Sequence, residues 1–420
     1  MSSGCRSHSL PPAWPTIVSG GVADLKGLPS QRRPSRLSLP STYGTTKRPA
    51  PLLIHFHGWA GTLESGMVFH SHGINNGYLV ASPLGFDDEG TQPASWNGAG
   101  TSGTSGRTCY DPTGAYASLR YSRSCHASPV NGTSCGWATC EDSVMQTQEL
   151  LDELDRAVCF DPQRVYATGV SNGGIFLYEL AASRLSTRFA GFMPLVGSPH
   201  RGFNRPHVGG PVPFFGLWGR NDDTVPPLPN PQARGHPGDP DVSVDTHYKS
   251  GGWYFTSASA VTRTWAKANG CSDTVPTLAS CNSSAACVTS VAGGASCVGY
   301  REGCGTHGVV LHCLHTGGHE VPVWAADALW SFMKEHAREP VPSPPPTPPP
   351  PMPTLQGRLA AAVSMPRRDL AAAGFFSAVL LAASLLLCRP LHGSRSAGAR
   401  RKTTKRERLA MYKSSQPVDV

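Results

Sequence analysis

The sequence has few charged residues, and most of its net charge is gathered at one end. Asp, Glu, Lys and Arg make up 15% of the 420 residues, and the formal net charge is +8. Nine Lys or Arg and two acidic residues follow Cys388, so seven of the eight net charges belong to this C-terminal tail. The rest of the chain is close to neutral, which removes the main argument for nucleic-acid binding. We therefore expect no nucleic-acid partner.

The sequence also lacks the spacing of a metal site. Structural zinc sites usually take paired C-x2-C ligands or Cys/His clusters. The close cysteine pairs are too far apart for that motif: Cys135/Cys140, Cys281/Cys287 and Cys297/Cys304. We therefore expect no metal, and the chemistry argued below needs no organic cofactor.

Residues 1–40 show no clear pattern, and the first twenty lack the apolar run of a cleavable signal peptide. The cysteines point the other way: eleven of the thirteen fall between Cys109 and Cys313, a density typical of disulfides formed in an oxidising compartment. Since eleven is odd, Cys5 is a candidate twelfth partner, whereas Cys388 lies in an apolar run and is expected to be unpaired. Either the true start of the chain is missing or a C-terminal helix directs targeting; we favour the first.

The chain beyond residue 338 has the composition of a stalk, a membrane span and a tail. Residues 339–358 are proline-rich and favour an extended spacer, with a ligand for a proline-recognition domain as the alternative. The nineteen residues from Leu370 to Cys388 are uncharged, about the length that spans a hydrocarbon core of roughly 30 Å. Residues 389–420 are basic, which predicts a cytoplasmic tail, with a nuclear signal as the alternative.

We therefore expect a single-pass membrane protein whose folded domain lies outside the cell or in a lumen. Two sequons, at Asn131 and Asn282, would be glycosylated there.

Residues 41–338 alternate short apolar runs with helical patterns, which predicts an α/β fold with a mostly parallel sheet covered on both faces. Residues 142–158 and 323–333 carry apolar residues at helical spacing. Residues 98–140 and 273–305 are rich in Gly, Ser or Cys without periodicity, so we expect disulfide-tied excursions from the sheet. The candidate strands are 52–57, 78–82, 164–168, 192–196, 212–218 and 309–314.

The most informative segment is an apolar strand that leads into Gly169-Val-Ser171-Asn-Gly173 and then into a helical stretch. This is the context of a nucleophile elbow. Its turn is so sharp that a Cβ at either glycine would meet the strand or the helix. We predict that Ser171 is a nucleophile.

A serine hydroxyl is a poor nucleophile near neutral pH, so a carboxylate and a histidine base should follow it in that order. The acidic pair Asp222 and Asp223 comes after the apolar strand that ends at Trp218. The loop after the last strand contains His319, preceded by two glycines that allow close approach to the nucleophile. We predict His319 as the base, since the nearby competitors lie within or before that strand: His307, His312 and His315.

Ester hydrolysis also needs N–H donors aimed at the developing oxyanion. The backbone N–H of Asn172, directly after the nucleophile, is one candidate. The other should come from the His57-Gly-Trp59-Ala60-Gly turn that follows strand 52–57, and we predict Trp59, with Ala60 as second choice. We expect His57 to be structural rather than an acid or base.

Five motifs, taken in order, resemble the polyhydroxybutyrate-depolymerase and feruloyl-esterase group of secreted esterases: 53–61, 95–98, 161–174, 218–226 and 317–322. The resemblance covers roughly residues 51–337 and implies an α/β-hydrolase fold. In that group the acid lies in a His-Gly-x-x-Asp-x-x-Val-Pro pattern, which matches Asp222, with Trp218 in place of the histidine.

The resemblance implies hydrolysis of carboxylic esters, including feruloyl or acetyl groups on polysaccharides and short hydroxyalkanoate polyesters. We expect a feruloyl-esterase-like serine hydrolase with the triad Ser171, Asp222 and His319. The alternatives are a polyhydroxyalkanoate depolymerase and a catalytically dead hydrolase-fold adhesion ectodomain. The cysteine-rich excursions and the anchor depart from the group, which affects the expected substrate more than the expected chemistry.

Overall fold

A computed structural model provides the three-dimensional structure of the protein. It describes Ser2, Cys5 and residues 17–26, 32–45, 48–87, 90, 93–101, 138–139, 141–229, 241–244, 254–272, 277–278, 295–300, 303–304 and 308–338. The chain divides into two units, Met1–Pro342 and Ser343–Val420, and all described residues belong to the first. The predicted stalk, span and tail, and both sequons, lie outside the described residues. None of the helices in the described part is both long and apolar enough to cross a membrane.

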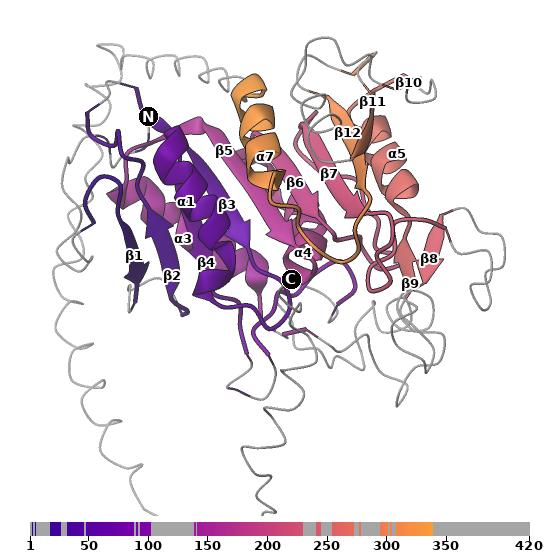
Figure 1. Cartoon of the computed structure of the whole chain (residues 1–420), viewed down its shortest axis with the longest axis horizontal. Coiled ribbons are helices and arrows are strands. Elements are labelled where there is room, and N and C mark those ends of the chain that lie inside the picture. The colour runs from indigo at the N-terminus through magenta and orange to yellow at the C-terminus, as the bar shows by residue number, and fades with distance from the viewer. Residues whose placement is uncertain are drawn as a thin grey trace, which may run out of the picture. The chain divides into compact units, whose positions relative to one another are not determined.

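Within the described residues, ten strands form one sheet in the order β1-β2-β4-β3-β5-β6-β7-β12-β11-β10 (Figure 1). The six strands from β4 to β12 are parallel, and the two strands at each edge are antiparallel to their neighbours. A separate antiparallel pair joins β8 to β9. The bounds are β1 Val22–Leu25, β2 Ser35–Ser38, β3 Ala50–Phe56, β4 Leu79–Pro83, β5 Phe160–Val170, β6 Gly191–Leu195, β7 Phe214–Gly219, β8 Val242–Val244, β9 Tyr254–Thr256, β10 Thr277–Leu278, β11 Ser296–Tyr300 and β12 Val310–His315.

Helices cover both faces of the sheet, as Figure 1 shows for α1 and α7 in front and α3 and α4 behind. Alternate residues of a strand point to opposite faces. Accordingly Leu52 and Ile54 of β3 join the core formed with α3, α4 and α5, whereas Leu53 joins the core formed with α1 and α7. This arrangement confirms the predicted α/β architecture. The helices are α1 Met67–Asn76, α3 Ser143–Ala157, α4 Asn172–Ala181, α5 Ala258–Ala268 and α7 Ala325–Glu335.

All six predicted strands are present as β3, β4, β5, β6, β7 and β12, and the two predicted helices as α3 and α7. The largest difference is in β5, which begins at Phe160 because this residue pairs with Ala50 across a register shift in β3. The sheet also begins before residue 41, the N-terminal limit predicted for the domain. β1 and β2 pair with each other, and β2 pairs with β4.

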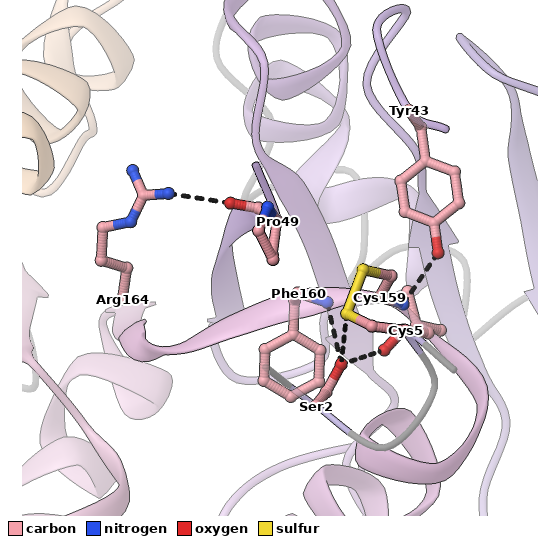
Figure 2. The surroundings of a disulfide bond; sticks show 8 residues. Ser2, Cys5, Tyr43, Pro49, Cys159, Phe160 and Arg164 are labelled. Carbon is pink, nitrogen blue, oxygen red and sulfur yellow. Dashed lines mark hydrogen bonds between the residues drawn. A yellow bond between two sulfur atoms is a disulfide. The ribbon is translucent and has the colours of Figure 1, made fainter. Parts of the chain in front are cut away.

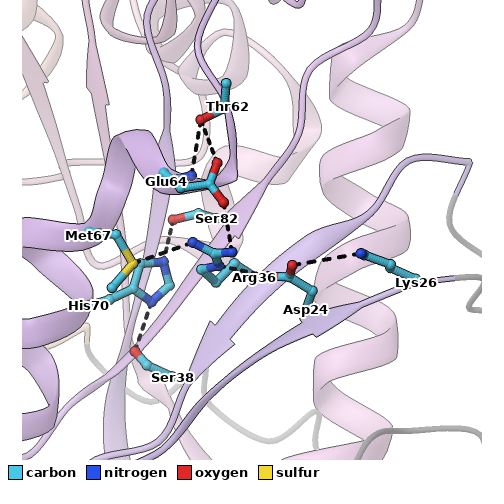
Figure 3. A network of polar contacts seen from close by, with 9 residues as sticks. All are labelled: Asp24, Lys26, Arg36, Ser38, Thr62, Glu64, Met67, His70 and Ser82. Atoms are coloured by element: carbon cyan, nitrogen blue, oxygen red, sulfur yellow. Dashed lines mark hydrogen bonds and ion pairs between the residues drawn. The ribbon is translucent and has the colours of Figure 1, made fainter.

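Polar contacts hold β2 against β1 and α1 (Figure 3). The Arg36 guanidinium on β2 donates to Asp24 on β1 at 2.7 Å. On α1, the buried His70 contacts Ser38 Oγ through Nδ1 and Ser82 Oγ through Nε2, both at 2.9 Å. Burial lowers the pKa of His70 to about 4. A neutral imidazole therefore links two strands through their serine hydroxyls.

The first residues of the chain are tied to the start of β5 (Figure 2). The Ser2 hydroxyl is buried, donates to the Val158 carbonyl at 2.6 Å and accepts from the Phe160 N–H at 3.0 Å. Cys5 forms a disulfide with Cys159. This confirms that Cys5 takes part in the disulfide framework.

Two further disulfides hold the described part of the second cysteine-rich excursion to the sheet. Cys297 on β11 pairs with Cys313 on β12, and Cys271 after α5 pairs with Cys304. The excursion returns to the sheet as the antiparallel strands β11 and β10. The cysteines of residues 98–140 lie outside the described residues.

Candidate active site

Ser171 occupies a sharp turn between β5 and α4. Its backbone has φ 53° and ψ −117°, a region that non-glycine residues rarely adopt. A Cβ at Gly169 would lie 2.4 Å from the backbone carbon of Gly173, and one at Gly173 would lie 2.2 Å from the Phe56 carbonyl oxygen. Glycine is therefore required on both sides, and the strand, turn and helix are as predicted.

The bare Gly-x-Ser-x-Gly pattern also occurs around Ser134, between Gly132 and Gly136. Ser134 lies outside the described residues and is not preceded by an apolar strand sequence. The pattern alone therefore does not identify a nucleophile, and the context of Ser171 distinguishes it.

The structure brings together the side chains of Ser171, His319 and Asp222. Ser171 Oγ lies 2.8 Å from His319 Nε2, and His319 Nδ1 lies 2.7 Å from Asp222 Oδ2. The three residues follow β5, β12 and β7, which are parallel members of one sheet, so their loops meet at the same edge. The three side chains form an unbroken hydrogen-bonded row.

The loops that carry the acid and the histidine are bound to each other. The Asn221 N–H donates to the Gly317 carbonyl at 3.0 Å, and the Asn221 side chain donates to the Thr316 carbonyl at 2.7 Å. A Cβ at Gly219 would lie 1.9 Å from the Gly318 carbonyl oxygen. Close contact between the loops therefore requires glycine at position 219.

The structure selects Asp222 from the acidic pair. Asp222 is buried, and its Oδ1 accepts from the N–H groups of Thr224 at 2.9 Å and Val225 at 2.8 Å. These two bonds leave Oδ2 directed at His319. Asp223 is exposed, with its carboxylate near the Thr224 hydroxyl.

The competing histidines that the structure describes lie outside the row. His312 on β12 packs against Trp218, with ring centroids 5.2 Å apart, and burial lowers its pKa to about 4. His315 accepts from the Gly317 N–H at 3.1 Å, and burial lowers its pKa too. His307 lies outside the described residues. His319 is thus the one of the described candidates that reaches Ser171.

The turn after β3 lies beside the nucleophile, as predicted. A Cβ at Gly58 would be 3.6 Å from the Cβ of Ser171. The Ala60 N–H donates to the Ala94 carbonyl at 2.9 Å, so the donor predicted as second choice is engaged within the fold. The other predicted donor, Asn172, begins α4, where the helix dipole is positive.

His57 is structural, as predicted. It is buried; Nε2 accepts from the Gly85 N–H at 2.9 Å, and Nδ1 donates to the Gly58 carbonyl at 2.6 Å. Burial lowers the pKa of His57 to about 4, so the ring is neutral near physiological pH. With both ring nitrogens hydrogen-bonded, His57 stabilises the turn that follows β3.

Trp218 joins the end of β7 to the segment after β6 through its indole N–H, a role that sequence reasoning missed. Its indole N–H lies 3.0 Å from the Gly197 carbonyl and 3.1 Å from Ser198 Oγ, just beyond the end of β6. It is fully buried at the end of β7, directly before the acid loop. In the His-Gly-x-x-Asp-x-x-Val-Pro pattern this position is usually a histidine, and that departure is the sequence signal for a role of Trp218.

Among the described residues, no group of three or more His, Cys, Asp or Glu side chains could hold a metal ion.

Part of the chain matches curated esterases. Over 77 residues it is 34% identical to a bifunctional acetylxylan esterase/xylanase of Neocallimastix patriciarum, covering 18% of this chain and 11% of that protein. Over 99 residues it is 32% identical to a probable feruloyl esterase C of Aspergillus niger, covering 23% of this chain and 35% of that protein. The chain thus matches about a third or less of these relatives' own lengths. No family model matches it.

Among solved structures, an acetyl xylan esterase from Aspergillus awamori aligns with a TM-score of 0.43 at 12% identity, over 74% of this chain and 99% of that chain. The sequence matches confirm what the motifs predicted: the chain is similar, over part of its length, to feruloyl and acetylxylan esterases.

Proposed function

We propose that this protein is a serine carboxylic-ester hydrolase with Ser171 as nucleophile, His319 as general base and Asp222 as orienting acid. The observation that carries the proposal is the row of two hydrogen bonds, 2.8 Å and 2.7 Å long, that joins these three side chains. An inactive adhesion ectodomain would have no need to keep all three residues in this arrangement.

In the first half of the reaction, Ser171 Oγ attacks the ester carbonyl carbon while His319 Nε2 takes the hydroxyl proton. The tetrahedral intermediate collapses as the C–O bond to the alcohol breaks, and His319 returns the proton to the leaving oxygen. In the second half, water attacks the acyl-enzyme, with His319 again as base, and releases the acid and free Ser171. Asp222 accepts the Nδ1–H bond throughout and stabilises the imidazolium.

The developing oxyanion would be held by the backbone N–H groups of Asn172 and Trp59. Each such donor is worth about 3–4 kcal/mol of transition-state stabilisation. The position of Gly58 against Ser171 and the start of α4 at Asn172 support this assignment.

We propose phenolic or acetyl esters of polysaccharides as substrates. The support is sequence similarity to proteins named as a feruloyl esterase and as an acetylxylan esterase/xylanase. A hydrolysis panel of the purified protein tests this, with methyl ferulate, acetylated xylan and hydroxybutyrate oligomers. We expect methyl ferulate or acetylated xylan to be hydrolysed fastest. Faster hydrolysis of the hydroxybutyrate oligomers would indicate a polyester substrate instead. Failure to hydrolyse any of the three esters would contradict the esterase proposal.

We also propose that the residues from Leu370 to Cys388 anchor the hydrolase to a membrane, with residues 339–358 as a stalk and 389–420 as a cytoplasmic tail. Asn131 and Asn282 would then carry glycans. The uncharged run and the basic tail support this, and so do the three disulfides of the described residues, since such bonds form in oxidising compartments.

A further inference from the structure

Trp96 lies between the two segments that carry the proposed oxyanion donors. Its indole N–H donates to the His57 carbonyl at 2.9 Å, two residues before Trp59. Its backbone N–H donates to Asn172 Oδ1 at 2.7 Å, and its carbonyl accepts from Asn172 Nδ2 at 3.1 Å. One residue thus contacts the turn after β3 and the residue after the nucleophile.

The Trp96 and Asn172 side chains are fully buried. The Trp96 ring meets Phe56 of β3 edge-on, with centroids 5.1 Å apart, and stacks on Phe176 of α4 at 5.7 Å. Burial shields these hydrogen bonds from bulk water, and packing on both sides restricts the orientation of the ring.

The segment around Trp96 is itself bound to both sides. The Ala94 carbonyl accepts from the Ala60 N–H at 2.9 Å, and the Ala99 N–H donates to the Glu179 carboxylate of α4 at 3.0 Å. Bonds to the turn after β3 and to α4 therefore occur on either side of Trp96.

We propose that Trp96 and the Asn172 side chain are positioning residues that fix the separation of the two oxyanion donors. Contact of Gly173 with the Phe56 carbonyl sets how closely the turn and the elbow approach, whereas the Trp96 bonds stop them from moving apart. Donors act only when they are aimed at the oxyanion within a narrow range of distance. This inference rests on the proposed esterase function.

Two substitutions remove the hydrogen bonds of Trp96 to the two segments. Trp96→Phe keeps an aromatic ring and removes the indole N–H, and Asn172→Ala removes both bonds to the Trp96 backbone. Because oxyanion contacts form in the transition state, each variant should lower kcat by about tenfold or more and change KM by less than about twofold.

The chain offers a matched control for each variant at the amino-terminal end of β7, whereas the active-site loops follow the carboxyl ends of the strands. Before β7, the Trp265 indole N–H donates to the Val212 carbonyl at 3.0 Å. The Asn269 amide accepts from the Val212 N–H at 3.0 Å and donates to the carbonyls of Val212 and Gly308, both at 2.9 Å. Trp265→Phe and Asn269→Ala therefore remove the same kinds of buried bond, with one bond more at Asn269. They should lower Tm by at least as much as Trp96→Phe and Asn172→Ala and leave kcat unchanged.

A second readout uses a boronic acid that mimics the tetrahedral intermediate, compared with the product acid. We expect Trp96→Phe and Asn172→Ala to weaken boronate binding by about tenfold or more and to leave product binding nearly unchanged. If Trp96→Phe does not fold, Asn172→Ala gives the answer.

Losses of kcat no larger than in the two controls would overturn the positioning role. Ser171→Ala, measured alongside, separates this failure from that of the proposed function. If Ser171→Ala is inactive while Trp96→Phe and Asn172→Ala are fully active, only the positioning role is rejected. If Ser171→Ala is active, the proposed function itself is rejected.

Discussion

His319 Nε2 lies 2.8 Å from Ser171 Oγ, although 148 positions separate the two residues in the sequence. The strands that precede them, β5 and β12, are not neighbours, since β6 and β7 stand between them. The contact therefore depends on the long-range strand order of the sheet. The Asp222 carboxylate, which follows β7, reaches His319 from the strand next to β12.

Replacing each carboxylate of the acid loop by an amide should lower activity by very different amounts. Asp222→Asn removes the acceptor that fixes the His319 tautomer, so we expect kcat on p-nitrophenyl acetate to fall by about three to four orders of magnitude. Asp223→Asn is the control, because Asp223 is exposed, and should stay within a few-fold of the wild type. A reversed ranking, or two small and equal effects, would place the acid elsewhere.

The stability of the folded protein should fall as the pH drops from about 6.5 to 4. Burial lowers the pKa of several histidines to about 4 or below, whereas the unfolded chain binds protons near 6.5. Between these values unfolding takes up protons, so each histidine lowers the free energy of unfolding by up to about 1.4 kcal/mol per pH unit. The histidines are His57, His70, His200 and His312.

Urea unfolding at pH 7, 6 and 5 measures this effect. The midpoint should decrease at each step, because the unfolded chain takes up protons that the buried imidazoles do not bind in the folded protein. An unfolding free energy that is constant between pH 7 and 5 would show that the pKa values of these imidazoles are not lowered in the folded protein.

Removing the N-terminal disulfide should destabilise the domain. The Cys5–Cys159 bond spans 154 positions, and loss of a native disulfide typically costs about 2–5 kcal/mol. We expect the double variant Cys5→Ser/Cys159→Ser to lower Tm clearly, and Cys388→Ser, whose thiol is predicted to be unpaired, to leave Tm unchanged. Equal Tm values for the wild type and both variants would mean that this disulfide adds no stability.

The sequence predicted those parts of the fold whose signals are local. Ser171 was found because an apolar strand, two glycines and a helix surround it, and His319 because it follows the last strand. α5 also has a readable local signal, since Val261 and Trp265 stand at helical spacing.

Other parts depend on tertiary contacts and could not be read from local patterns. β1 and β2 are four-residue strands with polar residues, so they carry little periodicity. In α1 the buried His70 interrupts the apolar face, and it is tolerated because Ser38 and Ser82 bind its ring. The contacts of Trp96 likewise join three segments that are distant in sequence.

The predicted topology can be tested with a signal sequence added to the full chain. We expect glycosylation that is lost in the variant Asn131→Gln/Asn282→Gln, and protection of the hydrolase from protease in intact microsomes, while the tail from Arg389 is digested. A chain that ends at Pro350 should be secreted in active form. A protected tail with a digested hydrolase would invert the topology and contradict disulfide formation, since cytosolic thiols stay reduced.

The nucleophilic role of Ser171 is tested most directly by labelling with a fluorophosphonate and locating the label by peptide mass spectrometry. The prediction is a single label on the peptide that contains Ser171, no label on Ser171→Ala, and normal labelling of Ser134→Ala, which lacks the other Gly-x-Ser-x-Gly serine. A label on another serine, or a Ser171→Ala protein with a tenth of the wild-type esterase rate, would contradict it.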